Sequence, residues 1–358
     1  MLEAGIVLSR FVHYAAVLTL FGISLFPLYT YPGRASGPPA RMNRRLRLAV
    51  SSAAFAALLS GCFWFTCVVA NMAGTLSGVL DWDTLWSVLS ETSFGKVSIA
   101  RFLLVMIILG RAAIRVTLPT QYPDRLTVAL SAALLASLAG VGHTLIHEGI
   151  TWIIHLSADG LHLLAAGAWL GGLVSLFYLV ATALRTCSPD DNVEASNAAL
   201  RFSSMGYVAV ATIVASGLLN AWPLVGSFAN LITTSYGQLL IVKLCLFGGM
   251  LALAALNRFW LVPSLIGDNK LRGAATGLFK LRGHILGEQA LGLLIILIVS
   301  AIGTMEPAMN SSQQGKWSDV RGSDSGLLRE RVRTKMRYAQ EPLENPRAGV
   351  DDELVYAG

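Results

Sequence analysis

The stretch HLSADGLHLLAAGAWLGGLVSLFYLVAT, residues 155–182, decides the fold class of this chain. After Asp159 it contains no Asp, Glu, Lys or Arg. It is also longer than the roughly 20 residues that a helix needs to cross a hydrocarbon core of about 30 Å. Because lipid offers no partners to backbone N–H and C=O groups, such a run is predicted to be helical. Barrel strands would alternate polar and apolar residues, and this run does not.

Seven further apolar runs of this kind lie along the chain. Its 358 residues are 54% hydrophobic and 13% charged, whereas soluble domains carry about 25% charged residues. We therefore predict an all-α, polytopic membrane bundle of eight transmembrane helices within residues 1–309, followed by a polar, loosely structured tail over residues 310–358. The predicted spans are 5–29, 46–71, 96–118, 125–147, 155–182, 203–226, 237–261 and 284–305.

The basic residues give these helices a direction. The loops after the second, fourth and sixth predicted helices contain one basic residue, Lys96, whereas those after the odd-numbered helices contain fifteen. Basic loops stay in the cytoplasm, so both termini are predicted to be periplasmic. The net charge of +6 belongs to this cytoplasmic belt, and we expect membrane lipid rather than nucleic acid as a partner. The fifteen residues are Arg34, Arg41, Arg44, Arg45, Arg47, Arg111, Arg115, Arg125, Arg185, Arg201, Arg258, Lys270, Arg272, Lys280 and Arg282.

Five of the six histidines fall on the outer half of this topology, and only His284 lies at the cytoplasmic end. Residues four or seven apart share one face of a helix. His155, Asp159 and His162 have this spacing, as do His143 and His147. Ionisable residues inside a membrane are expensive and mark ligand or transport sites. The pattern predicts a polar site near the outer surface.

The chemistry of these side chains favours copper. Imidazole binds copper, zinc, iron and nickel, and thioether sulfur favours Cu(I). A calcium or magnesium site would need more carboxylates. Asp159 is either a ligand or a second-shell acceptor that fixes a histidine tautomer, and the second role is favoured. The predicted metal ligands are His13, His143, His147, His155, His162 and Asp159, with Met72, Met305 and Met309 as accessory ligands.

Other polar residues within the predicted spans need partners. Glu288 is interpreted as a gate, a proton carrier or the partner of a cytoplasmic arginine, and Asn257 is predicted to form interhelical hydrogen bonds. For Lys243 and Arg101, the alternative to a functional role is an extended side chain that reaches the outer surface. No phosphate-binding loop, dinucleotide motif or Ser-His-Asp arrangement occurs. We expect a transporter rather than an enzyme.

Four segments resemble the CopD family of copper-resistance membrane proteins: HLSADGLHLLAAGAWLGGL at 155–173, RFSSMGYVAVATIVASGLLNAW at 201–222, SYGQLLIVKLCLFGGMLALAALNRF at 235–259 and GEQALGLLIILIVSAIGTMEPA at 287–308. The resemblance implies an inner-membrane protein of eight spans that handles copper. It also implies a separate CopC-like periplasmic copper chaperone as partner. The family's polar positions correspond to Asp159, His162, Lys243, Asn257 and Glu288.

Two functions compete. In the leading hypothesis, copper enters from the periplasm, binds His13, His155 and His162 with help from His143 and His147, and moves inward past Lys243 and Glu288. The alternative is a b-type haem or copper-dependent membrane oxidoreductase. There, His13 with His162, or His143 with His155, would ligate haem from two helices. A structural role would leave the histidines scattered around the bundle.

Overall fold

The computed structural model describes residues 2–31, 40–117, 124–139, 150–225, 228–264 and 272–305, all within the first of two compact units, Met1–Met309. These residues form helices and turns, with no strand among them. Seven of the described helices are long and apolar enough to cross a membrane. An all-α membrane bundle is thereby confirmed. The seven are α1 Leu2–Thr30, α2 Ala40–Ala73, α4 Ser93–Thr117, α6 Ile150–Thr186, α7 Pro189–Val225, α9 Ser235–Leu256 and α11 Arg272–Ile302.

The prediction of eight spans is not confirmed. In the place of the fourth predicted span, 125–147, lies α5, Arg125–Ala136, which has 12 residues. A helix of this length covers about 18 Å, less than the ~30 Å of the hydrocarbon core. Residues 137–139 continue as a turn, and residues 140–149 lie outside the described part of the chain.

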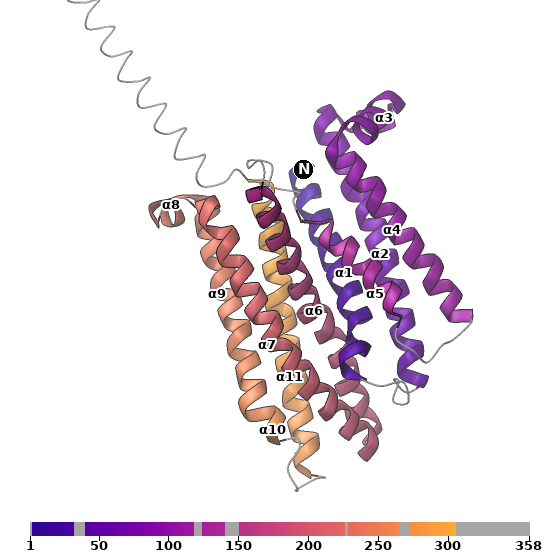
Figure 1. Cartoon of the computed structure of the whole chain (residues 1–358), viewed down its shortest axis with the longest axis vertical. Helices are drawn as coiled ribbons and strands as arrows, with labels where there is room; N and C mark the ends of the chain where they lie inside the picture. The colour runs from indigo at the N-terminus through magenta and orange to yellow at the C-terminus, as the bar shows by residue number, and fades with distance from the viewer. Residues whose placement is uncertain are drawn as a thin grey trace, which may run out of the picture. The chain divides into compact units, whose positions relative to one another are not determined.

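Short helices that hydrophobicity does not predict lie between the long ones. They are η2 Leu76–Leu80, α3 Trp82–Glu91, α8 Phe228–Thr233 and α10 Val262–Ser264. Figure 1 shows α3 and α8 at the end of the bundle where α1 begins, and α10 at the opposite end.

The helix α3 suits a membrane surface. Asp81 caps it by accepting hydrogen bonds from Thr84 Oγ1 at 2.5 Å and Thr84 N at 3.1 Å, and these bonds lower the pKa of the Asp81 carboxyl. Trp82 and Trp86 stack on each other with 6.3 Å between ring centroids, and they are 70% and 59% exposed. Amphipathic aromatic rings of this kind prefer the headgroup region.

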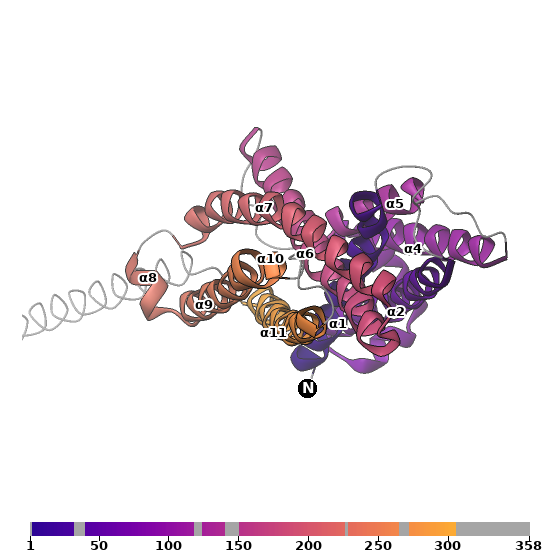
Figure 2. The same ribbon diagram turned by 90° about the horizontal axis from the view of Figure 1, so that it is seen from below.

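Two helices, α1 and α6, form the centre of the bundle (Figures 1 and 2). They cross where Gly22 meets Gly171, and a Cβ atom on Gly22 would lie 2.4 Å from the Gly171 Cα. Glycine at both positions lets the two backbones approach closely. The helices run parallel, because Phe21 lies beside Gly167 and Tyr29, further along α1, lies beside Gly172.

These two central helices carry the same pattern of residues. His13 is followed by Gly22 after nine residues and by Tyr29 after sixteen, and His162 is followed by Gly171 and Tyr178 at the same intervals. The next long helices continue the correspondence, since α2 and α7 each carry a Ser-Gly pair beside the histidine of the preceding helix.

The third helix of each repeat, α4 in the first and α9 in the second, has the most similar sequence. Residues 92–101 read TSFGKVSIAR and residues 234–243 read TSYGQLLIVK. In each, the threonine hydroxyl caps the helix by accepting from the glycine N–H, at 2.9 Å for Gly95 and 3.0 Å for Gly237. In each, the tenth residue is basic, Arg101 in α4 and Lys243 in α9. The helices α1, α2 and α4 therefore correspond to α6, α7 and α9, as in membrane proteins built from parallel repeats.

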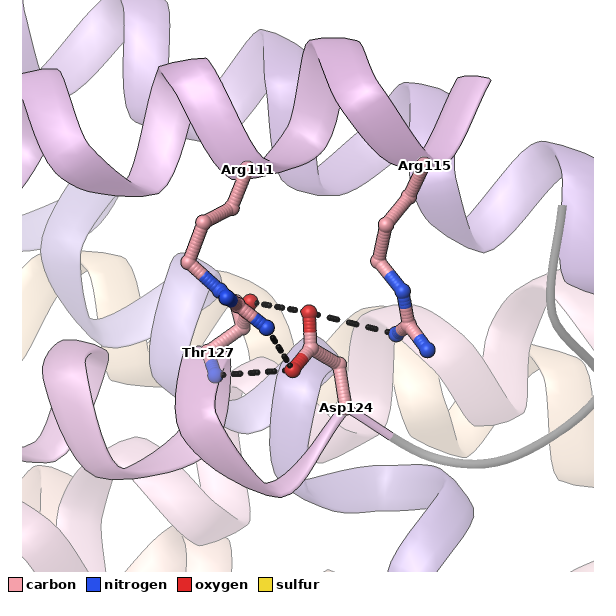
Figure 3. Close-up of polar contacts among 4 residues, drawn as sticks. All are labelled: Arg111, Arg115, Asp124 and Thr127. Atoms are coloured by element: carbon pink, nitrogen blue, oxygen red, sulfur yellow. Dashed lines mark hydrogen bonds and ion pairs between the residues drawn. The ribbon is translucent and has the colours of Figure 1, made fainter. Parts of the chain in front are cut away.

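An ion-pair cluster joins α4 to α5 (Figure 3). Asp124 caps α5 by accepting from Thr127 N at 3.2 Å and Thr127 Oγ1 at 2.6 Å. The same carboxylate pairs with Arg111 at 2.8 Å and Arg115 at 3.2 Å, both at the end of α4. One aspartate thus begins α5 and fixes it against the preceding helix.

Candidate functional site

His162 is held in one tautomer by α7. Its Nδ1 lies 3.0 Å from Ser216 Oγ, and Ser216 donates its own hydroxyl proton to the Thr212 carbonyl at 2.5 Å. The serine oxygen therefore accepts from His162, which places the imidazole proton on Nδ1. The Nε2 lone pair is left for a ligand, the arrangement found in metal-binding histidines.

His155 is oriented by a chain of hydrogen bonds that ends at Asp159. Asn220 on α7 donates from Nδ2 to Asp159 Oδ1 at 2.6 Å. This bond orients the amide, so Asn220 Oδ1 accepts from His155 Nδ1 at 3.3 Å. Asp159 therefore acts on His155 through Asn220, which is the geometry of a second-shell acceptor.

A third helix contributes a cation to the same region. Lys243 on α9 lies close enough to Asp159 and His162 for its charge to act on both side chains. Tyr236, two turns earlier on α9, also interacts electrostatically with Asp159. The site thus combines two imidazoles and one carboxylate from α6 with one amine from α9, and α7 contributes the Ser216 hydroxyl and the Asn220 amide.

A second polar group surrounds Glu288, which is 2% exposed. Trp169 Nε1 donates to Glu288 Oε2 at 3.0 Å, and Asn257 Nδ2 donates to Oε1 at 2.7 Å. His284 Nδ1 lies 2.7 Å from Asn257 Oδ1. Asn257 also begins a π-helical turn, η4, Asn257–Leu261, and such turns are frequent at functional sites.

One face of α6 connects the two groups. Trp169 follows His162 by seven residues, which is two turns or about 10 Å along the helix. The Trp169 ring packs edge-on against Phe247 of α9, with centroids 6.2 Å apart. Phe247 lies one turn beyond Lys243, so an aromatic pair separates the His162 group from the Glu288 group.

His13 belongs to a different group of contacts, on α2. Its Nδ1 lies 3.0 Å from the Ala57 carbonyl and 3.2 Å from Ser60 Oγ, while Ser60 donates to the Ala56 carbonyl at 2.6 Å. His13 is 2% exposed. Its hydrogen bonds therefore lead to α2, whereas those of His155 and His162 lead to α7.

Two buried arginines accompany His13. The Cζ atoms of Arg10 and Arg101 lie 5.3 and 5.5 Å from the centroid of the Trp64 ring. Arg101 is only 4% exposed and donates to Ser137 from Nε at 3.0 Å and from Nη2. The alternative that Arg101 extends to the outer surface is therefore wrong, because its guanidinium is bound inside the bundle.

Of the remaining predicted residues, only Met72 and Met305 lie in the described part of the chain. Met72 is 55% exposed at the end of α2, and Met305 is half-buried just after α11. His143, His147 and Met309 lie outside the described residues. Within the part of the chain that the structure describes, no group of three or more His, Cys, Asp or Glu residues is placed to hold a metal ion.

Three residues of these groups were not predicted as site residues, although His284 was placed at the cytoplasmic end. Ser216, Trp169 and His284 carry no charge pattern that singles them out. The internal repeat is the signal that points to Ser216, because Ser60 has the same place beside His13 in the first half. Aligning the two halves of the sequence would also have assigned His13 and His162 to two different sites.

Comparison with known proteins fits this two-part organisation. Residues 1–153 match the N-terminal domain of copper resistance protein D-like proteins, and residues 196–302 match copper resistance protein D. The chain is 31% identical over 301 residues to the inner membrane protein YebZ of Escherichia coli, covering 83% of this chain and 97% of that protein. It is 30% identical over 310 residues to copper resistance protein D of Pseudomonas syringae pv. tomato, covering 84% and 96%. This chain belongs to the copper resistance protein D family.

A further relative of this copper resistance protein D family member is the copper transport protein CutJ of Bacillus subtilis. The two are 28% identical over 311 residues, which cover 86% of this chain and 53% of the relative. No solved structure matches the chain. The first matched domain contains His13, Trp64 and Arg101, and the second contains Lys243 and Glu288. The sequence-based assignment to the family is confirmed.

Proposed function

We propose that this protein transports or transfers copper at the bacterial inner membrane and takes the metal from the periplasmic side. The main support is the orientation of two imidazoles of α6, His155 and His162. In each ring, Nδ1 is hydrogen bonded to a side chain of α7, and Nε2 lies on the opposite side of the ring. Imidazole is a suitable ligand for copper. Relatives named for copper resistance and copper transport support the same cargo.

The orientation follows from charge and aromatic residues. Loops rich in Lys and Arg remain in the cytoplasm, which places the N-terminus, the start of α6 and the end of α11 on the periplasmic side. The exposed tryptophans of α3 then lie at the periplasmic surface. With this orientation, His155 and His162 lie in the outer part of α6, where arriving copper meets them first.

Each residue of the site has its own role in this proposal. His155 and His162 are the ligands, and Asp159 orients His155 through Asn220. Lys243 balances the Asp159 charge while no metal is bound, and an incoming cation displaces the ammonium group or its proton. His143, His147, Met72, Met305 and Met309 are proposed as further ligands at the outer mouth. His13 is left out, because Arg10 and Arg101 lie near it without a carboxylate among the described residues, whereas Asp159 balances Lys243 near His162.

The inward path leads from His162 past the Trp169–Phe247 pair to Glu288. A buried carboxylate can exchange a proton for a cation, so Glu288 is proposed as the gate or proton carrier of the transport step. Asn257 connects this carboxylate to His284 near the cytoplasmic end.

The donor is proposed to be a separate CopC-like periplasmic copper chaperone. Delivery by a protein would keep the concentration of free copper low. The chaperone would dock at the periplasmic end, where α3 and α8 lie. Mixing a copper-loaded CopC-like protein with the purified membrane protein, and measuring metal transfer, tests this part of the proposal.

Metal content of the purified full chain tests the site itself. Wild type should bind copper, and His162→Ala should lose most of it. His13→Ala tests whether one site or two exist, and we expect its copper content to equal that of wild type. Unchanged copper in His162→Ala contradicts the proposal. A visible Soret band that survives purification and disappears in His162→Ala would instead establish the haem-dependent oxidoreductase.

A further inference from the structure

The first repeat contains a buried cationic group that the copper proposal does not use. Arg10 of α1 and Arg101 of α4 both lie over the ring of Trp64, at 5.3 and 5.5 Å from its centroid. The three residues are 8%, 4% and 3% exposed. Two guanidinium groups are thus held on one ring inside the bundle, and their like charges repel.

Several donors in this group have no acceptor. Arg10 Nε and Nη1 and Trp64 Nε1 are buried and form no hydrogen bond. No carboxylate among the described residues pairs with Arg10 or Arg101, and the hydrogen bonds to Ser137 come from Arg101 alone. Buried donors in native proteins are nearly always satisfied, so unpaired ones call for a partner such as an ion. A buried charge without a counter-charge also needs a partner, because burying an unpaired charge costs free energy.

An unpaired acceptor lies in the same group. Ser60 Oγ donates to the Ala56 carbonyl, so His13 donates from Nδ1 and carries its lone pair on Nε2. That nitrogen is buried and has no hydrogen-bond partner. The ligand that completes the group therefore presents charged oxygens to Arg10 and Trp64 and a hydroxyl group to His13.

The second repeat shows which charge is missing. Arg10 stands three residues before His13, and Asp159 stands three residues before His162. Trp64 and Asn220 each follow the Ser-Gly serine by four residues, and Arg101 corresponds to Lys243. In the second repeat, the carboxylate of Asp159 therefore balances the basic residue of the third helix. In the first repeat, an arginine replaces that carboxylate, and two cations face each other.

The depth of the group allows a ligand from the membrane surface. Arg10 and Arg101 each lie eight residues after the start of their helix, about 12 Å along its axis. The 29 residues of α1 span more than 40 Å, which exceeds a ~30 Å hydrocarbon core, so the helix ends reach into the headgroup layer. Arg10 also lies at the end of α11, since a Cβ on Gly303 would be 2.2 Å from Arg10 Nη1.

We propose that Arg10, Arg101, Trp64 and His13 form a binding site for a phosphate group. Guanidinium groups bind phosphate oxygens in a fork geometry, and Trp64 Nε1 adds an indole N–H donor. The phosphate comes either from free hydrogen phosphate, whose P–OH donates to His13, or from a phosphatidylglycerol headgroup, whose glycerol hydroxyl does so. The site is independent of copper and distinct from the His162 group.

The test uses the full chain in phosphatidylcholine nanodiscs, with phosphate-free buffer. One arm adds inorganic phosphate, and the other replaces part of the lipid with phosphatidylglycerol. Native mass spectrometry should detect one bound phosphate or one retained phosphatidylglycerol, and the unfolding temperature should rise saturably with that ligand. Arg10→Gln and Arg101→Gln should each weaken binding at least tenfold. Trp64→Phe, which keeps an aromatic ring but lacks Nε1–H, should weaken it several-fold.

A matched control and two opposing outcomes make the result decisive. Arg258 is stacked on Tyr207 at 5.4 Å outside this group, so Arg258→Gln should bind like wild type. Absence of saturable binding of either probe to wild type overturns the proposal, as does unchanged binding in both Trp64→Phe and Arg10→Gln.

Discussion

His13 and His162 occupy equivalent positions in two repeats, and each hydrogen bonds through Nδ1 to the serine of a Ser-Gly pair on the next helix. The imidazole geometry is the same in both halves, but the residue three positions earlier is Arg10 in one and Asp159 in the other. Electrostatics therefore separates the two sites. Beside His162 the Asp159 carboxylate balances Lys243, as the proposed copper site requires, whereas beside His13 two arginines face each other, as the proposed anion site requires.

The Ser216 hydroxyl is expected to control copper affinity, although it does not touch the metal in the proposed site. Ser216→Ala removes the acceptor that keeps the proton on His162 Nδ1, so the ring can turn or change tautomer. Loss of such a second-shell partner typically lowers metal affinity about 10- to 100-fold. Competition with a copper chelator measures this change. Ser204→Ala, on the exposed face of α7, should leave affinity unaltered; equal affinities in all three proteins would exclude the role of Ser216.

Glu288 is expected to affect movement of copper more than its binding at His162. In Glu288→Gln, one of the two donors, Trp169 Nε1 or Asn257 Nδ2, would face the amide NH₂ group instead of a carboxylate oxygen, and no negative charge would remain to meet a cation. Copper content of the purified variant should stay near that of wild type, whereas copper uptake into proteoliposomes should fall at least tenfold.

The control for this variant is Glu91→Gln on the exposed surface of α3, which should transport normally. A Glu288→Gln protein that transports at the wild-type rate would remove Glu288 from the path. One that loses copper during purification would place Glu288 in the binding site itself.

The crossing of α1 and α6 is expected to tolerate no side chain at its centre. A Cβ on Gly22 would lie 2.3 Å from the Gly167 carbonyl oxygen, and one on Gly171 would lie 2.5 Å from the Leu18 carbonyl oxygen. These are backbone contacts that cannot move aside, so Gly22→Ala or Gly171→Ala should destabilise the fold by about 1–3 kcal/mol. Thermal unfolding in detergent measures the change.

Gly160 provides a control in the same helix as Gly171. A Cβ at Gly160 would meet nothing within 4 Å, and alanine is the better helix former by about 1 kcal/mol. Gly160→Ala should therefore be neutral or stabilising. Equal destabilisation by Gly160→Ala and Gly171→Ala would mean that the close crossing is not the cause.

Hydrophobicity predicted the long helices because lipid imposes one requirement on all of them. The same criterion missed α3, whose exposed Trp82 and Trp86 alternate with polar residues at the membrane surface. It also extended the fourth span to residue 147, whereas α5 ends at Ala136. Hydrophobicity thus predicts where a long apolar helix lies better than it predicts where a helix ends or where a short helix forms between two long ones.

The site was predicted only in part, for a geometric reason. Helical spacing identifies residues that share one face of their own helix, as His155, Asp159 and His162 do. It does not say which neighbouring helix that face meets. His13 has the right depth to join His162, but its ring hydrogen bonds to α2, while His162 hydrogen bonds to Ser216 of α7. Only the packing of α1 against α2 and of α6 against α7 reveals this difference.

Asp124 is expected to stabilise the α4–α5 pair over a defined pH range. Burial alone would raise the pKa of its carboxyl, but hydrogen bonds from Thr127 and Arg111 and the charge of Arg115 hold it below the ordinary value of 3.8. A carboxyl with a lowered folded-state pKa contributes stability above its unfolded pKa and loses that contribution as the pH falls through the folded value. Asparagine also caps helices, so Asp124→Asn chiefly removes the ion pairs with Arg111 and Arg115 and should be less stable than wild type by about 1 kcal/mol near neutral pH. The gap should stay constant from about pH 8 to pH 5 and narrow below about pH 4. Unfolding midpoints across this range test the prediction, with exposed Asp190→Asn as the control, and a gap that widens towards acid pH would contradict it.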